Sequence, residues 1–203
     1  MKKFLSLLLV CVMLVSLCGC DILNSDFSLG EVLGNRYENE FLGLSCTLPA
    51  DWRFYTQEEI LELNDLAEDL LDEDIAKQLK KADLIYDMFA QCGSDSSNMN
   101  VVMEKLKLPQ IIRLDIKKTL EAQKDTIEWS YRDMGYTNIK VSYQTVEVDG
   151  KEFDGLRITA KIQGVDFYGT VFAFKAGTYM ANVTVCSIQT DKTDTLLSYF
   201  TVE

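Results

Sequence analysis

The residues that could carry chemistry in this chain are carboxylates, because its 203 residues include 32 Asp and Glu and no His. Without His, the commonest general base and metal ligand near neutral pH is missing. Neither a Ser-His-Asp nor a Cys-His arrangement can be built. Two carboxylates could still act as a glycosidase pair, but no spacing singles out such a pair. We therefore predict that the protein is not an enzyme and that it has no cofactor.

The clearest carboxylate pattern is a stripe along one face of a predicted helix. Its members, Glu58, Glu62, Asp65, Asp69 and Asp72, follow helical spacing opposite an apolar face. Like charges at this spacing cost a helix a few tenths of a kcal/mol each, so the stripe opposes helix stability. Three interpretations stay open: a contact surface for a basic protein partner, a weak divalent-cation site, or a solvated face. No calcium-loop motif is present, so we assign no metal ligands.

Aromatic side chains offer a second kind of candidate site. Trp52 could close the mouth of a cleft or plug the fold, and Tyr168, Phe172 and Phe174 could line a pocket. An aromatic stripe on a central strand is more often core. Binding of a small ligand or of a weak divalent cation is therefore the alternative function.

The first twenty residues predict where the protein resides. Lys2 and Lys3 precede an apolar run over Phe4–Leu17, which is too short to cross a bilayer as a helix. We expect residues 1–19 to be a signal peptide. The sequence Leu17-Cys18-Gly19-Cys20 resembles the lipobox of bacterial lipoproteins, which implies a diacylglyceryl group on Cys20. The resemblance implies an exported protein whose membrane partner is reached through Cys20, at the outer face of the cytoplasmic membrane.

The charge and the remaining cysteines limit other partners. The net charge is −12, and loss of Lys2 and Lys3 with the signal would make the mature chain more acidic. We expect no nucleic-acid partner, since nucleic acids are bound through Lys and Arg. Cys46, Cys92 and Cys186 are widely spaced, so at most one disulfide can form and all three can be free. The oligomeric state is not indicated.

Predicted helices begin at residues suited to capping. Thr56-x-x-Glu59 matches a capping box, and Asp72, Asp115 and Asp191 are expected to cap three further helices. The helix from Asp115 should end at Gly135. Residues expected to turn inward on the first helix are Ile60, Leu63, Ala67 and Leu70, and on the last segment Leu196, Leu197 and Phe200.

Alternating apolar residues predict the strands, which dominate the last third of the chain. Asp149-Gly150 is the two-residue turn that right-twisted hairpins prefer, and two more Gly-containing turns follow. Short connections require antiparallel neighbours, so a four-strand meander is expected. The predicted strands are residues 44–48, 84–92, 99–108, 139–148, 151–162, 165–175 and 178–188. We expect residues 20–36 to be a tether and residues 37–203 to form one domain.

The segment Leu44-x-Cys46-x-Leu48-Pro49-x-x-Trp52 resembles the strand-Pro-x-x-Trp opening of the PsbP-like (DcrB-like) family. Ile85-Tyr86-Asp87-Met88 and Met134-Gly135-Tyr136 are further points of likeness to Gram-positive lipoproteins of this type. The resemblance implies an α+β fold in which an antiparallel sheet, including the C-terminal meander, is flanked by helices on both faces. It also implies a membrane-anchored extracytoplasmic module that binds or helps to assemble other proteins.

Overall fold

The structure is a computed structural model that describes residues 27–64 and 82–203. Several sequence predictions fall outside these residues: the signal peptide, Cys20, the helix expected at Asp72, and the stripe residues Asp65, Asp69 and Asp72. Four helices are described: α1 (Gln57–Leu63), α3 (Leu108–Arg113), α4 (Ile116–Asp133) and α5 (Thr193–Leu197). None of the helices in the described ranges is long and apolar enough to cross a membrane.

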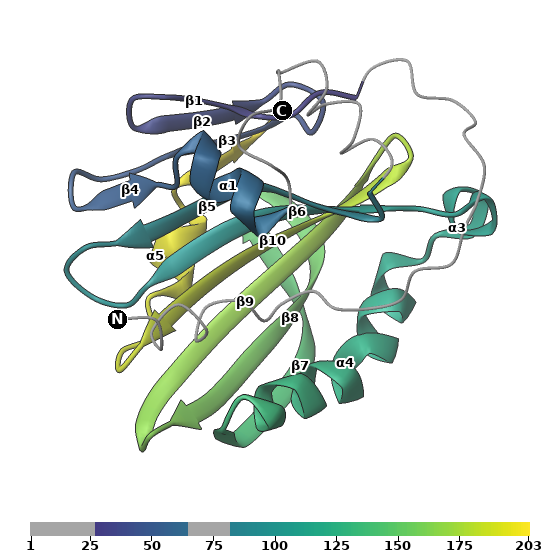
Figure 1. Cartoon of the computed structure of the whole chain (residues 1–203). Helices are drawn as coiled ribbons and strands as arrows, with labels where there is room; N and C mark the ends of the chain where they lie inside the picture. Colours follow the sequence, from purple (N-terminus) through teal and green to yellow (C-terminus); the bar gives the residue numbers. More distant parts are fainter. Residues whose placement is uncertain (1–26, 65–81) are drawn as a thin grey trace.

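The strands of the described part form two antiparallel sheets (Figure 1). The larger sheet has the order β4 (Trp52–Phe54), β5 (Leu84–Cys92), β6 (Asn98–Lys105), β10 (Tyr179–Ile188), β9 (Val165–Ala176), β8 (Lys151–Ile162) and β7 (Tyr136–Val148). The smaller sheet has the order β1 (Glu31–Leu33), β2 (Arg36–Asn39), β3 (Leu44–Thr47) and β11 (Phe200–Val202). The first and last strands of the described chain therefore belong to one sheet.

The predicted meander is confirmed as β7, β8, β9 and β10, which pair in sequence order. Its turns contain the residues that a tight hairpin requires. Asp149 and Gly150 both have positive φ, at 52° and 74°, as a type I′ turn demands. Gln163 and Gly164 repeat the pattern with φ of 50° and 84°.

Two predicted helix starts are also confirmed. Thr56 caps α1 with the reciprocal bonds of a capping box, and Asp115 caps α4 by accepting the Lys118 N–H at 3.0 Å. Gly135 follows α4 with φ of 89°. The inward face of α1 differs from the prediction, because Leu61 is its buried residue whereas Ile60 and Leu63 are half-buried.

The predicted fold class is wrong. Strand makes up 51% and helix 22% of the described structure, and a second sheet covers much of the face opposite α4. Helix α4 covers one face, where Leu120 and Tyr131 pack against Phe167 and Ile158 of the sheet. The small sheet covers most of the other face together with α5, which contributes Leu196 and Leu197 to the core. The fold is two packed antiparallel sheets rather than the PsbP-like arrangement, because β1, β2, β3 and β11 form a second sheet of their own.

Strand β9 shows why two layers of cover are needed. Phe167, Val171 and Ala173 face the core under α4, whereas Phe172 lies in the core between the sheets. Both faces of β9 are thus covered, and Phe172 belongs to the core, as the sequence favoured for an aromatic stripe on a central strand. Tyr168 is half-buried beneath the guanidinium of Arg157, 5.6 Å from its ring.

Four predicted boundaries or assignments are also corrected. The tether does not extend to residue 36, because Phe27 is buried in the core and the chain enters β1 at Glu31. Pro109 does not end a strand; β6 ends at Lys105 and Pro109 lies in the first turn of α3, which needs no N–H from it. Lys192 rather than Asp191 is the N-cap of α5, although Asp191 Oδ1 accepts the Thr193 N–H at 3.2 Å. Phe200 lies in β11 and not in a helix.

The two sheets meet where the β7–β8 hairpin reaches β11. Asp149 Oδ2 accepts the Val202 N–H at 3.2 Å, and Lys151 Nζ donates to the Val202 carbonyl at 2.9 Å. Gly155 lies in this curled part of β8. A Cβ at Gly155 would lie 2.4 Å from the Val171 carbonyl oxygen and 2.5 Å from Cγ2 of Val146. Only Gly allows the strands to approach this closely.

Candidate functional site

The described part of the acidic stripe does not form a site by itself. Glu58 and Glu62 are exposed on α1, and the other three members lie outside the described residues. Trp52, in β4, packs with its ring edge-on to Tyr199 at a centroid distance of 6.2 Å. The ring also packs against the core between the sheets, so the described contacts fit the structural interpretation of Trp52.

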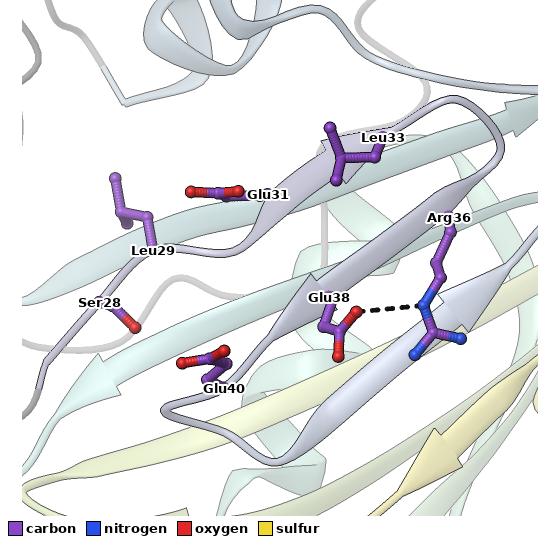
Figure 2. A pocket seen from close by; sticks show the side chains of 7 residues that line it. All are labelled: Ser28, Leu29, Glu31, Leu33, Arg36, Glu38 and Glu40. Atoms are coloured by element: carbon purple, nitrogen blue, oxygen red, sulfur yellow. Dashed lines mark hydrogen bonds and ion pairs between the residues drawn. The ribbon is translucent and has the colours of Figure 1, made fainter.

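The β1–β2 hairpin carries a concave acidic surface, although residues up to 36 were predicted to be a tether. Its cavity has a volume of about 280 Å³ (Figure 2). We call it the acidic groove; its lining residues are Ser28, Leu29, Glu31, Leu33, Arg36, Glu38 and Glu40. Alternation along two neighbouring strands places the charged members on one face. The groove thus combines three carboxylates with apolar side chains.

The carboxylates of the acidic groove are held close together by strand pairing. Glu31 and Glu38 are directly opposite each other in the register of β1 and β2, a like-charge arrangement that destabilises a hairpin. Arg36 Nε offsets part of this repulsion through an ion pair with Glu38 Oε2 at 3.2 Å. The groove therefore keeps a negative charge that a cationic group of a partner can neutralise.

The outer edge of β1 adds a backbone surface to the acidic groove. β1 is the terminal strand of the small sheet as described, so its outer N–H and C=O groups face no strand of that sheet. Val32 and Leu33 are 42% and 76% exposed, which is unusual for large apolar residues. An edge strand with exposed apolar side chains can accept an extended peptide by β-augmentation.

A buried carboxylate holds the hairpin in place. Asp87 sits at a β-bulge in β5, and it accepts bonds from the Tyr37 hydroxyl, from Asn39 Nδ2 at 2.7 Å and from the Gly30 N–H at 3.0 Å. A Cβ at Gly30 would lie 2.2 Å from the Tyr37 ring, so only Gly fits there. Asp87 therefore ties two parts of the chain to the large sheet: the segment before β1 and strand β2.

The electrostatics of Asp87 favour this structural role. Burial raises its pKa above the ordinary value, although the hydrogen bonds from Tyr37, Gly30 and Asn39 act in the opposite direction. Burial, followed by the charge of Asp87, raises the pKa of Tyr37 well above its usual range. Both oxygens of Asp87 are occupied by internal donors, so the carboxylate is a poor candidate for catalysis.

A second polar feature lies on the central strands, on the same face of the sheet as α4. Asn98 and Asn100 in β6 and Asn182 and Thr184 in β10 are all buried. We call these four residues the amide row. Thr184 and Asn100 are cross-strand neighbours, and among the described residues neither Thr184 Oγ1 nor Asn100 Oδ1 has a hydrogen-bond partner. Buried oxygens of this kind are normally satisfied, so the row can accept bonds from a small donor.

The cysteines of the described ranges are free thiols. Burial raises the pKa of Cys46 to about 12, which makes its thiol a weak nucleophile. Cys186 is buried as well, and the half-buried Cys92 donates to Asp51 at 3.4 Å. Within residues 27–64 and 82–203, no three Cys, Asp or Glu side chains are grouped so as to hold a metal ion.

Comparison with known proteins adds little to this geometry. No protein-family model matches the chain, and no match is found among curated proteins. Among solved structures, the chain is similar to LpqN, involved in cell envelope biogenesis of Mycobacterium tuberculosis, with a TM-score of 0.40 and 11% identity over 76% of this chain and 75% of LpqN. A Bacteroides thetaiotaomicron protein gives a TM-score of 0.41 and 8% identity over 84% of this chain but only 48% of its own length. At these scores neither likeness carries an inference about function.

Proposed function

We propose that the protein is an exported lipoprotein, anchored through Cys20, whose folded part binds a basic partner and catalyses no reaction. The observation that carries this proposal is the acidic groove, where three glutamates adjoin the exposed Leu33 on an unpaired strand edge. The partner that fits is an extended segment with alternating cationic and apolar residues. Its backbone would pair with β1 while its cations meet Glu31, Glu38 and Glu40.

Charge reversal in the acidic groove should weaken binding of such a segment. The probe is a fluorescently labelled peptide of alternating Lys and Leu, and its affinity is measured by anisotropy at low and high salt. The double variant Glu31→Lys, Glu38→Lys is expected to bind about tenfold more weakly, since it replaces attraction by repulsion. Binding to the unaltered protein should weaken as salt rises.

The matched control is another exposed glutamate pair. Glu147 and Glu152 are directly opposite in β7 and β8, so Glu147→Lys with Glu152→Lys changes the net charge by the same amount. This control should leave the affinity unchanged. Equal weakening by both double variants would show that the peptide senses only net charge and would refute the acidic groove as the binding site.

A second candidate function, binding of a small neutral ligand, is supported by the amide row. Two buried acceptors side by side suit a ligand that donates from a hydroxyl or amide group. Protein purified from the cells that produce it is expected to carry an added mass in native mass spectrometry. Thr184→Val should remove this mass, whereas Thr145→Val, on the exposed side of β7, should retain it. An unaltered protein without added mass would refute this candidate.

A further inference from the structure

One corner of this acidic protein is basic and apolar. Residues 105–118, which we call the α3 corner, include α3 and the first turn of α4. The cations in this segment are Lys105, Lys107, Arg113, Lys117 and Lys118, and Asp115 is its single carboxylate. Leu108 and Ile112 of α3 are 49% and 77% exposed. Exposed apolar residues among cations form the surface that binds the headgroup region of an anionic bilayer.

Not all of these cations are equally available. Lys118 Nζ pairs with Asp115 at 2.9 Å, and Lys117 Nζ lies 4.5 Å from the centre of the Tyr143 ring. Lys107 and Arg113 flank the exposed apolar residues at the two ends of α3. These two side chains are therefore the best placed to contact phosphate groups while Leu108 and Ile112 enter the interface.

The α3 corner lies at the same end of the molecule as Phe27, the first described residue. The Phe27 ring is 5.0 Å from the ring of Tyr179, and Tyr179 pairs with Lys105 at the end of β6. The Leu106 N–H donates to the Thr178 carbonyl at 2.8 Å, next to Tyr179. Figure 1 shows α3 at the right-hand edge of the molecule, with the β1–β2 turn on the opposite side.

The length of chain between Cys20 and Phe27 restricts how the folded part can lie. Seven residues span at most about 25 Å when fully extended. A domain of this size has a radius of gyration of roughly 16 Å, so its diameter exceeds that reach. A lipid on Cys20 would therefore hold the end that contains Phe27 against the bilayer. The surface that faces the bilayer at this end of the molecule includes the α3 corner.

We propose that the α3 corner rests on the anionic headgroups of the membrane and orients the folded part above it. This inference depends on the proposed anchoring through Cys20. Charges farther away than about 8 Å are screened at physiological salt, so the acidity of the rest of the protein does not cancel the local attraction. The anchor position and the exposed Ile112 favour a lipid surface over an acidic protein. The β1–β2 turn is then left facing away from the lipid.

Hydrogen exchange on the lipidated full chain tests this orientation. The protein is reconstituted into vesicles of phosphatidylcholine alone or of phosphatidylcholine and phosphatidylglycerol in equal parts. Amides of the α3 corner are expected to exchange several-fold more slowly on the anionic vesicles, and peptides from β7 and β8 should be unaffected. The double variant Lys107→Glu, Arg113→Glu should abolish the difference. A control with the same charge change, Arg132→Glu with Lys140→Glu, should retain it.

The outcomes separate this inference from the proposed function. If Cys20 is lipidated and the α3 corner exchanges equally on both vesicles, the orientation is refuted while the anchoring stands. If the mass of the N-terminal peptide shows no lipid on Cys20, both are refuted. Slower exchange that appears only when other membrane proteins are added would overturn the assignment to lipid.

Discussion

Asp87→Ala is expected to lower the free energy of unfolding by about 3 to 5 kcal/mol, the largest effect of any polar substitution in the described residues. Alanine would leave the Tyr37 hydroxyl, the Asn39 amide and the Gly30 N–H without their acceptor. Each buried donor left unsatisfied costs about 1 to 3 kcal/mol. Urea unfolding followed by fluorescence measures the loss. Glu58→Ala, on the exposed side of α1, is the control and should change stability little.

The pH dependence of Asp87→Asn tests the same network. The pKa of Asp87 is raised in the folded state, so protonation of Asp87 stabilises the folded protein as the pH falls. This stabilisation is complete below the pKa of the unfolded chain, near 3.8. This contribution is lost as the pH rises through the folded pKa. The stability difference between the unaltered protein and Asp87→Asn should therefore be larger at the acidic end. A stability difference that grows toward neutral pH would contradict a raised pKa of Asp87 in the folded protein.

Gly155→Ala is the second substitution with a large expected effect, a loss of about 3 kcal/mol. The added methyl would meet the Val171 carbonyl oxygen at 2.4 Å, and a backbone oxygen in the middle of a sheet cannot move aside cheaply. Strands β7, β8 and β9 would have to separate at this point. Thermal unfolding should show a markedly lower midpoint. The contacts of the β7–β8 hairpin with β11 should also be weakened.

The matched control is Gly169, a buried glycine in the neighbouring strand β9. A Cβ at Gly169 would make ordinary contacts of 3.4 Å with Phe167 and 3.5 Å with Ile158. Gly169→Ala should therefore change the free energy of unfolding by less than about 1 kcal/mol. Alanine also lowers the conformational entropy of the unfolded chain, which offsets part of any loss. Similar losses at Gly155 and Gly169 would show that the clash with Val171 is not the cause.

Local signals in the sequence predicted several elements of the fold. The capping residues Thr56 and Asp115 act within one helical turn, and Asp149-Gly150 fixes a hairpin from two adjacent positions. Such signals need no knowledge of distant residues. The small sheet could not be predicted in this way, because its strands have three or four residues and β11 joins β3 from the other end of the chain. Short strands show too little alternation to be recognised.

The candidate site was missed for a related reason. Residues 31–36 were predicted to be tether, although Gly34 and Asn35 form the turn between the antiparallel strands β1 and β2. Asp87 stands alone within an apolar strand, and its sequence gives no sign of the three donors that reach it from residues 30 to 39. The amide row depends on the register of β6 with β10, which only the structure shows.

The pairing of Thr201 with Ser45 has a consequence for the order in which the protein folds. The small sheet cannot close until residues 200–202 are available to pair with β3, and contacts so distant along the chain form slowly. The small sheet is therefore completed later than the β7–β8 hairpin, whose strands are joined by two adjacent turn residues.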